Sequence, residues 1–191
     1  MSSMRVFLAL DLPMAIRSQL VLQQFLMPVK RKQPPENFHI TMLFLGDVAP
    51  DILEDLHSAL ERLTLAPFSV QIAGLGLFGG ARAHNLHARV TPSPELTAMH
   101  EKLLRLARIS GLTPEARRFK PHVTLAYLKP ETFHQPELEA AVARDHGFRT
   151  DSFDVSELVL YRSHLRSDGA QYDVLERYPF SASDHSRMHL R

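Results

Sequence analysis

Two short stretches of the chain decide how it folds, FHITML at residues 38–43 and PHVTLA at residues 121–126. Each stretch places a histidine two residues before a threonine inside an apolar run. These residues are His39 and Thr41 in the first stretch and His122 and Thr124 in the second. Residues two apart on a β-strand project from the same face, so each stretch presents an imidazole beside a hydroxyl. We predict that the two strands face each other and that these side chains form a phosphate site.

The hydrophobic spacing around the first stretch predicts alternating strands and helices. Residues 5–10, apolar from Val6 onward and stopped by Asp11, indicate a buried strand. Apolar residues recur at helical spacing in residues 15–27 and again in 51–63, and the apolar run at 68–78 ends in turn residues. The first half of the chain therefore reads as strand, helix, strand, helix, strand.

The second half is predicted to repeat this order. Its predicted elements are a half-buried strand at 85–90, a helix at 92–110, the second histidine strand at 119–128, a short helix at 136–143 and strands at 153–161 and 172–178. Asp168 and Gly169 provide a hairpin-like turn between the last two strands. The two histidine motifs then occupy matching places in the two halves.

The repeated order of elements indicates an ancient duplication. We therefore predict an α+β fold with two pseudo-symmetric lobes, each a mainly antiparallel sheet with helices on the outside. The lobes are expected to enclose a central groove that the histidine strands line. Residues 1–180 are expected to form one bilobal domain, and the polar, unpatterned residues 181–191 a flexible C-terminal tail.

Composition excludes several classes of function. The 191 residues are 45% hydrophobic, enough for a sizeable core, and the chain has no cysteine, which excludes disulfides, thiolate metal sites and a cysteine nucleophile. No apolar run approaches membrane-spanning length or resembles a signal peptide, so a cytoplasmic protein without membrane contact is expected. The formal net charge of +1 gives no general attraction to nucleic acid, so any contact with RNA must come from a local patch.

Two imidazoles across a groove suit acid–base chemistry at a phosphodiester. Because the pKa of histidine lies near neutrality, one ring can accept a proton while the other, charged, donates one. The hydroxyls of Thr41 and Thr124 can donate to the non-bridging oxygens, which gain negative charge in the transition state. This chemistry needs neither a metal nor a cofactor. For either histidine alone, a structural, hydrogen-bonded imidazole is the competing interpretation.

Metal binding is the other interpretation of a chain with 11 histidines. Further imidazoles are available at His84, His87, His134, His146 and His164. Strand spacing, however, places His84 and His87 on opposite faces, and the chain has no His-Glu-x-x-His pattern. No acidic residue accompanies either motif. We therefore predict no metal site.

Basic residues near the second motif are further candidates for phosphate binding. Arg117, Arg118 and Lys120 precede His122 directly. Arg82 and Lys129 stand farther from it in sequence, Arg82 behind a Phe-Gly-Gly loop. Such charged side chains usually lie exposed to solvent at the edge of a site. Arg82 could instead form an ion pair that joins the two lobes. Both interpretations stay open.

The pattern as a whole resembles the 2H phosphoesterase superfamily, and within it the bacterial and archaeal RNA 2′,3′-cyclic phosphodiesterases once named 2′-5′ RNA ligases. The resemblance covers nearly the whole chain. Besides the two His-x-Thr motifs it rests on RVFLALDLP at 5–13, ENFHIT with FLG at 36–46, FKPH at 119–122 and LYRS at 160–163.

This resemblance implies a cofactor-independent enzyme. Its substrates would be RNA ends or nucleotides that carry a 2′,3′-cyclic phosphate. It implies that the 3′ oxygen leaves, that a 2′-phosphomonoester remains, and that the reverse reaction gives 2′-5′ ligation. His39 would be the proton donor, His122 the proton acceptor, and Thr41 and Thr124 the hydroxyls that hold the phosphate. No obligatory protein partner is implied, and a monomer is expected.

The chain departs from the family pattern at one position. Relatives often carry arginine five residues after the second motif histidine, whereas this chain has Tyr127. Either Lys129, Arg82 or an arginine before His122 supplies the missing charge, or the substrate differs within the superfamily. An ADP-ribose cyclic phosphate and a 2′-5′-linked oligonucleotide are the alternative substrates. A non-catalytic RNA-binding module is the alternative from another class.

Overall fold

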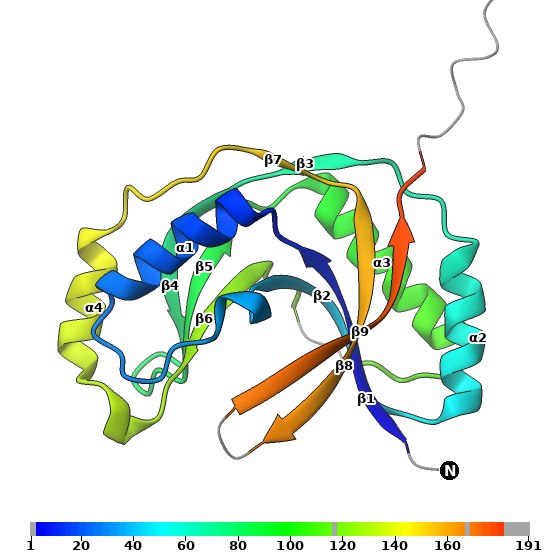
Figure 1. Cartoon of the computed structure of the whole chain (residues 1–191), viewed down its shortest axis with the longest axis horizontal. Helices are drawn as coiled ribbons and strands as arrows, with labels where there is room; N and C mark the ends of the chain where they lie inside the picture. Colours follow the sequence, from blue (N-terminus) through cyan, green and yellow to red (C-terminus); the bar gives the residue numbers. More distant parts are fainter. Residues whose placement is uncertain (1–2, 116–117, 167–168, 182–191) are drawn as a thin grey trace, which may run out of the picture.

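The computed structural model describes residues 3–115, 118–166 and 169–181, and its elements follow one plan twice (Figure 1). The first copy contains β1 (Met4–Asp11), α1 (Met14–Leu26), η1 (Pro35–Asn37), β2 (His39–Val48), α2 (Pro50–Glu61), β3 (Phe68–Val70) and β4 (Ile72–Phe78). The second contains β5 (Asn85–Val90), α3 (Pro94–Ile109), β6 (His122–Tyr127), η2 (Pro130–Thr132), α4 (Gln135–Arg144), β7 (Phe153–Val155) and β8 (Glu157–Arg166), and β9 (Gly169–Pro179) follows. The order of elements is the repeat that the sequence predicts.

The main sheet has seven strands in the order β4-β5-β6-β2-β1-β8-β9, and every neighbouring pair is antiparallel. The prediction of an antiparallel α+β fold is confirmed. The two lobes share this one sheet, however, and meet where β2 lies beside β6. The copies also exchange strands, because β4 of the first pairs with β5 of the second, and β8 of the second pairs with β1 of the first. Each half of the sheet therefore contains strands from both copies.

Two of the predicted strands are each split in two. A single residue, Gln71 in the first copy and Ser156 in the second, separates a three-residue strand from the strand of the main sheet that follows. The three-residue strands β3 and β7 pair with each other as a separate sheet, with Phe68 opposite Val155. Apolar runs at 68–78 and 153–161 look continuous in sequence because both pieces of each run are buried on one side. Each run is divided because its two pieces pair with different strands.

The ends of some elements also differ from the prediction. The strand predicted at 119–128 begins only at His122. The predicted hairpin is present, since β8 and β9 pair with Arg166 opposite Gly169. Asp168 of its turn and residues 182–191 of the predicted tail lie outside the described residues.

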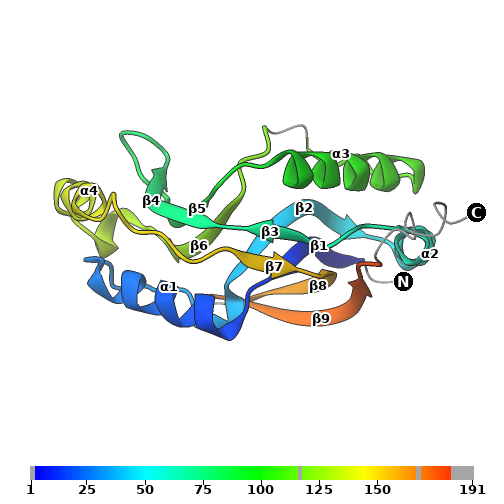
Figure 2. The ribbon, with the colours of Figure 1, turned by 90° about the horizontal axis from the view of Figure 1, so that it is seen from above.

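Helices α1 and α3 position the histidine strands. α1 buries Ile16 and Leu20, and the buried amide of Gln24 donates to the backbone oxygen of Leu125 in β6 at 2.8 Å. α3 starts at a Ser93 cap and lies against β2 on the other side of the strands in Figure 2. Among the described residues, no helix combines the length and apolar character needed to cross a bilayer.

One apolar cluster holds helices and strands together. Its central members lie on alternate positions of neighbouring strands and are fully buried: Leu8, Leu10, Leu86, Ala88, Ile40 and Val123. Burial of one large aliphatic side chain contributes about 1.5–3 kcal/mol. Since strand residues alternate between faces, the residues between these must project from the opposite face of the sheet.

Candidate active site

The two His-x-Thr motifs lie side by side in the middle of the main sheet. Ile40 of β2 is directly opposite Val123 of β6 in an antiparallel pair, and both side chains are buried in the core. The flanking residues of both strands therefore project from the other face, which we call the histidine face. It carries His39, Thr41, His122 and Thr124. The antiparallel register brings the histidine of each motif level with the threonine of the other.

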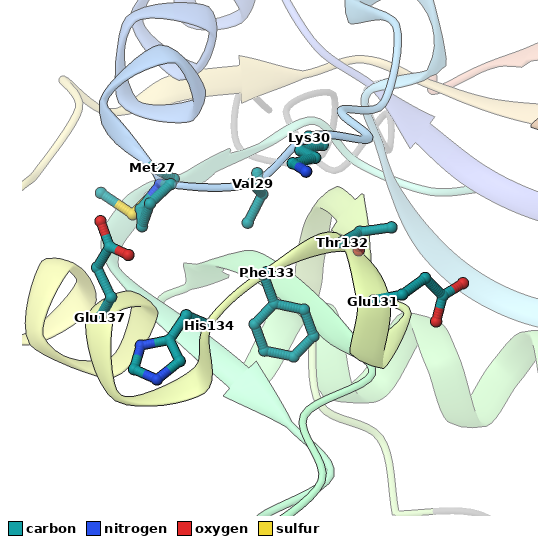
Figure 3. A pocket seen from close by; sticks show the side chains of 9 residues that line it. Met27, Val29, Lys30, Glu131, Thr132, Phe133, His134 and Glu137 are labelled. Carbon is teal, nitrogen blue, oxygen red and sulfur yellow. The ribbon is translucent and has the colours of Figure 1, made fainter.

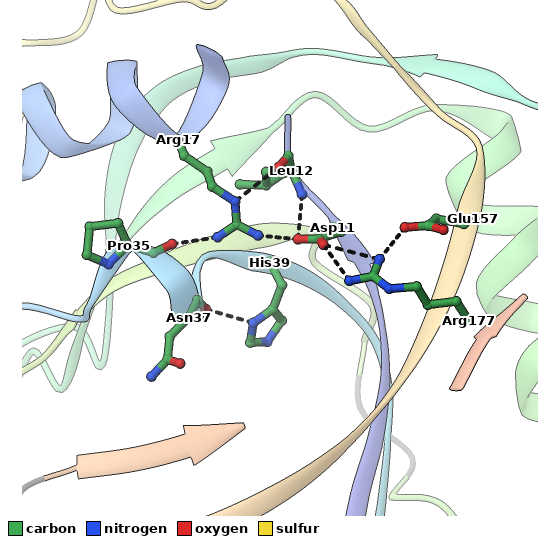
Figure 4. A network of polar contacts seen from close by, with 8 residues as sticks. All are labelled: Asp11, Leu12, Arg17, Pro35, Asn37, His39, Glu157 and Arg177. Carbon is green, nitrogen blue, oxygen red and sulfur yellow. Dashed lines mark hydrogen bonds and ion pairs between the residues drawn. The ribbon is translucent and has the colours of Figure 1, made fainter. Parts of the chain in front are cut away.

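His39 is held by its own strand. Its Nδ1–H donates to the backbone oxygen of Asn37 at 2.8 Å, as Figure 4 shows. Because a carbonyl oxygen can only accept, the proton of the neutral ring is on Nδ1, and Nε2 carries a lone pair. The hydroxyl of Thr41 lies 3.1 Å from Nε2 and donates to it. The first motif is thus a preformed imidazole and hydroxyl pair.

His122 repeats the backbone contact of His39 in the second copy. Its Nδ1–H donates to the backbone oxygen of Lys120 at 2.7 Å. The neutral ring therefore presents the lone pair of Nε2, the atom needed for proton abstraction. Burial lowers the pKa of His122, and the bond to the Lys120 carbonyl opposes that shift. His122 is consequently neutral at pH 7.

The free protein also keeps His39 neutral. Burial is the main reason that the pKa of His39 falls from 6.5 to about 4. The positive charge of Arg17 lowers this pKa further, and so does that of His122 when it is protonated. The Asn37 carbonyl and the Asp11 carboxylate act in the opposite direction.

A charged network fixes the backbone beside His39 (Figure 4). Asp11, at the end of β1, forms ion pairs with Arg17 of α1 and with Arg177 of β9. Arg177 also pairs with Glu157 of β8, and Arg17 donates to the backbone oxygens of Leu12 and Pro35. These contacts tie three strands and α1 to the segment that leads into the first motif.

Aromatic rings from three further strands surround His39. Phe7 of β1 lies against it, with ring centroids 4.9 Å apart, and stacks in turn on Tyr161 of β8 at 5.2 Å. Tyr172 of β9 meets His39 edge-on at 5.3 Å. Burial raises the pKa of Tyr161 to about 12, so this phenol is neutral. The rings restrict His39 to one orientation.

The second motif is supported by β5, whose part in the site sequence reasoning missed. The side-chain amide of Asn85 donates to Thr124 Oγ1 at 3.1 Å, which leaves the hydroxyl proton of Thr124 free for another acceptor. His87, two residues on, meets His122 edge-on with centroids 5.2 Å apart. The available signal was the alternation of the strand at 85–90, which sets both side chains on one face.

The predicted phosphate-binding candidates fall in different places. Lys120 lies near the second motif, with Nζ 5.8 Å from the Phe78 ring that meets His122 edge-on at 4.9 Å. Arg82 is exposed in the β4–β5 turn and Lys129 is exposed just after β6, and neither forms an ion pair with a described residue. Their part in phosphate binding stays a prediction.

Two more basic positions complete this comparison. Arg118 is exposed before β6, whereas Arg117 lies outside the described residues. Sequence reasoning missed Arg89, which lies directly opposite His122 in the β5–β6 register and so projects from the histidine face. Arg89 Nε donates to the backbone oxygen of Leu75 at 2.8 Å, and this bond anchors the guanidinium beside the second motif.

Tyr127 stands at the position where the family resemblance leads us to expect arginine. It is 51% exposed, lies opposite Asn85 in the β5–β6 register, and lies close enough to Tyr172 to help burial raise the pKa of that phenol. Tyr172 in turn touches His39. A tyrosine pair therefore links β6 to β9 at the first motif, where an arginine would bring a positive charge.

Cavities elsewhere do not include the motif residues. One of about 460 Å³ lies between the segment after α1 and the start of α4, lined by Met27, Val29, Lys30, Phe133, His134 and others (Figure 3). Another, of about 340 Å³, lies between α2 and the β8–β9 pair. Within the described residues, no group of three or more histidine and acidic side chains is arranged to hold a metal ion.

The chain is similar to proteins of known family. A family model described as the 2′-5′ RNA ligase superfamily matches residues 18–166. The RNA 2′,3′-cyclic phosphodiesterase of Thermus thermophilus is 31% identical over 189 residues, covering 92% of this chain and 89% of that protein. The Escherichia coli protein of the same name is 28% identical over 177 residues, covering 91% and 95%. The one of Geobacillus stearothermophilus is 30% identical over 156 residues, and the chain spans 48% of its length.

Solved structures agree with these sequence matches. Escherichia coli LigT in its apo form has a TM-score of 0.75 to this chain at 25% identity, covering 95% of this chain and 100% of LigT. A crystal structure described as a phosphoesterase has a TM-score of 0.76 at 25% identity, covering 94% and 99%. LigT has also been crystallised with 3′-AMP.

Proposed function

The chain belongs to the 2′-5′ RNA ligase superfamily, and from this we propose that it hydrolyses the 2′,3′-cyclic phosphate at RNA or nucleotide ends. The product is a 2′-phosphomonoester with a free 3′ hydroxyl, and the reverse reaction is 2′-5′ ligation. The relatives named as RNA 2′,3′-cyclic phosphodiesterases support this activity. The observation that carries it in this chain is the Ile40–Val123 register, which gathers both motifs on one sheet face.

In the proposed mechanism His122 is the base. Its Nε2 lone pair accepts a proton from a water molecule as the water oxygen bonds to phosphorus. The neutral state at pH 7 and the Nδ1–H bond to Lys120 both suit this step. The bond from phosphorus to the 3′ oxygen breaks, and His39 donates the proton that this oxygen takes up. The imidazoles exchange roles in the reverse direction.

The substrate itself must prepare His39 for the donor role, because the free ring is neutral. A cyclic phosphodiester carries one negative charge, and an anion beside an imidazole raises its pKa. The bound phosphate therefore favours proton uptake at Nε2, the atom that Thr41 contacts in the free protein. Uptake turns the Thr41 hydroxyl toward the phosphate, since a protonated Nε2 no longer accepts its hydrogen bond.

The two threonine hydroxyls are proposed to hold the non-bridging oxygens. Asn85 already occupies an acceptor site of Thr124, so its hydroxyl proton points toward a ligand. Negative charge grows on these oxygens in the transition state, and fixed donors stabilise it without reorganisation. No step in this scheme requires a metal ion or a cofactor.

The test is turnover of adenosine 2′,3′-cyclic phosphate in the presence of excess chelator. Phosphorus NMR distinguishes the 2′ from the 3′ monophosphate, and the proposal requires the 2′ product. His39→Ala and His122→Ala should each abolish most of the turnover. Activity that disappears with chelator and returns with an added metal would overturn the proposed mechanism.

Tyr127 favours one alternative, a related substrate. Without arginine at this position the contact with the phosphate differs from that of many relatives, and an ADP-ribose cyclic phosphate or a 2′-5′-linked oligonucleotide remains a candidate. Comparing kcat/KM across a small panel decides between them. A non-catalytic RNA-binding module would instead bind these ligands without turnover by the intact protein. We propose that the protein works as a cytoplasmic monomer on RNA ends or free nucleotides.

A further inference from the structure

The repeat places each motif histidine at the end of a row of three rings. In each row a ring from the last strand of one copy, β8 or β4, stacks on a ring from the first strand of the other copy, β1 or β5. This second ring then meets the motif histidine. The rows are Tyr161, Phe7 and His39 in one half of the sheet and Phe78, His87 and His122 in the other. His87 therefore occupies the place that Phe7 occupies beneath His39.

His87 is a part of the site that the proposed chemistry does not use. It is only 4% exposed, stacks on Phe78 at 3.9 Å with an interplanar angle of 21°, and lies edge-on to His122 at 66°. Its Nδ1 has no hydrogen-bond partner among the described residues. Through this nitrogen the ring therefore offers its neighbour no hydrogen bond, only shape and desolvation.

The sheet is shaped to admit this ring. Gly76 of β4 lies directly opposite His87, and a Cβ atom at Gly76 would stand 2.8 Å from His87 Nε2. Any side chain at position 76 would therefore push the imidazole out of its place. A glycine beneath the ring leaves His87 room to lie flat between Phe78 and the second motif.

We propose that His87 is a positioning residue for the second motif, whose ring holds the imidazole of His122 in the orientation that water activation requires. This inference rests on the proposed function. The ring of His87 meets that of His122 in the place where Phe7 meets His39. His87 does not need to touch the substrate, because Phe78 and His122 cover it.

Several charged groups surround His87 and His122 and affect the pKa of both rings. Lys120 approaches from the segment before β6, Arg89 from β5 and His39 from β2. Burial, followed by the positive charges of His122, Arg89 and Lys120, lowers the pKa of His87 to about 3, so this ring is neutral in the working range. A change in the pKa of His122 on substitution of His87 therefore reports lost desolvation rather than a lost charge.

The experiment compares His87→Ala, His87→Phe and Gly76→Ala with the wild type, using adenosine 2′,3′-cyclic phosphate. His87→Ala should lower kcat by about 10-fold or more and leave KM nearly unchanged, because a misplaced catalytic group slows the chemical step by up to about 10²-fold. His87→Phe should keep kcat within about threefold of the wild type, since its ring restores the contact. Gly76→Ala should behave like His87→Ala, although it leaves both histidines in the chain.

NMR titration of His122 gives a readout independent of turnover. Water admitted by His87→Ala should raise the pKa of His122 toward 6.5, whereas His87→Phe should keep it low. His146→Ala is the matched control, because it removes an exposed imidazole beyond α4 that bonds only to the Ala143 backbone oxygen. Circular dichroism confirms that each variant is folded.

The outcomes separate this inference from the proposed function. A wild type without turnover overturns both. A wild type that turns over, loses activity with His122→Ala and keeps it with His87→Ala overturns the positioning role alone. The role is also wrong if His87→Phe is as impaired as His87→Ala, because a nitrogen of the imidazole would then be required.

Discussion

Ile40 of β2 lies directly opposite Val123 of β6, and this register sets both His-x-Thr motifs on one face of the sheet. Both side chains are fully buried, so a slip of one residue would place apolar groups on the histidine face and the imidazoles in the core. The core therefore fixes the site. A change of register would lower the stability of the protein as well as its activity.

Replacing either motif histidine by alanine should remove an acid or base step. We expect kcat for adenosine 2′,3′-cyclic phosphate to fall by about 10²–10⁴-fold for His39→Ala and for His122→Ala. Release of the 2′-phosphomonoester, followed by phosphorus NMR or chromatography, measures the change. His146→Ala is the control, because His146 is exposed beyond α4 and bonds only locally to the Ala143 backbone oxygen. If a variant keeps kcat within a factor of ten of the wild type, the replaced histidine is not the acid or base of the reaction.

Removing one motif hydroxyl should weaken transition-state stabilisation without disturbing the strand. Thr41→Val and Thr124→Val keep the β-branched shape, and each should lower kcat/KM by about 10²-fold, as expected for the loss of one fixed donor to a growing negative charge. Steady-state kinetics measure this. Thr124→Ser retains the hydroxyl that Asn85 orients and should keep most of the activity. Equal rates for Thr124→Val and Thr124→Ser would show that the hydroxyl does not act on the phosphate.

Binding of inorganic phosphate should raise the pKa of His39. In the free protein burial holds this pKa at about 4, and a bound anion stabilises the charged ring. By linkage, phosphate should bind more tightly as the pH falls from 7 toward 5. NMR titration of the imidazole with and without saturating phosphate measures both effects. An unchanged pKa at saturation would mean that the anion does not sit beside His39.

Stability should fall at acid pH because two buried imidazoles must be neutral in the folded protein. The pKa values of His39 and His87 are lowered from 6.5 to about 4 and about 3, so below pH 6.5 the unfolded chain binds more protons than the folded one. Stability is therefore complete above pH 6.5 and is lost progressively toward pH 3. Between pH 7 and 5 the His87 contribution is about 2 kcal/mol, or about 4–8 °C in Tm.

His87→Phe isolates this contribution, because its ring does not titrate. The variant should show a smaller drop of Tm between pH 7 and 5 than the wild type, measured by calorimetry in buffers of equal ionic strength. Identical pH dependence in the two proteins would contradict the assignment of a neutral, buried His87.

The basic groups that flank the second motif should act on binding rather than on chemistry. Arg89→Gln and Lys120→Gln are expected to raise KM a few-fold at low salt and to leave kcat nearly unchanged, because exposed charges attract an anion weakly and through solvent. The salt dependence of kcat/KM should flatten in both variants. Arg105→Gln, on the exposed surface of α3, is the control. A loss confined to kcat would place Arg89 or Lys120 at the reacting phosphate instead.

The local pattern of the sequence predicts most of the elements. The continuous apolar run at β1 and the periodic apolar residues of α2 and α3 place these elements within one or two residues of their ends. The same local logic identifies both motifs, since a histidine and a threonine two apart on a strand share a face wherever that strand lies. This local pattern does not predict that the runs are split at Gln71 and Ser156, because both pieces of each run are apolar.

The sequence by itself thus determined the two motifs, the repeated order of strands and helices and the class of chemistry, all of which depend on neighbours along the chain. Only the tertiary structure decided that both lobes share one sheet, that the copies exchange strands, and that Asn85, His87 and Arg89 stand beside the second motif. These features depend on pairing between strands far apart in sequence, whose register is chosen by the burial of Ile40 against Val123 and not by any local pattern.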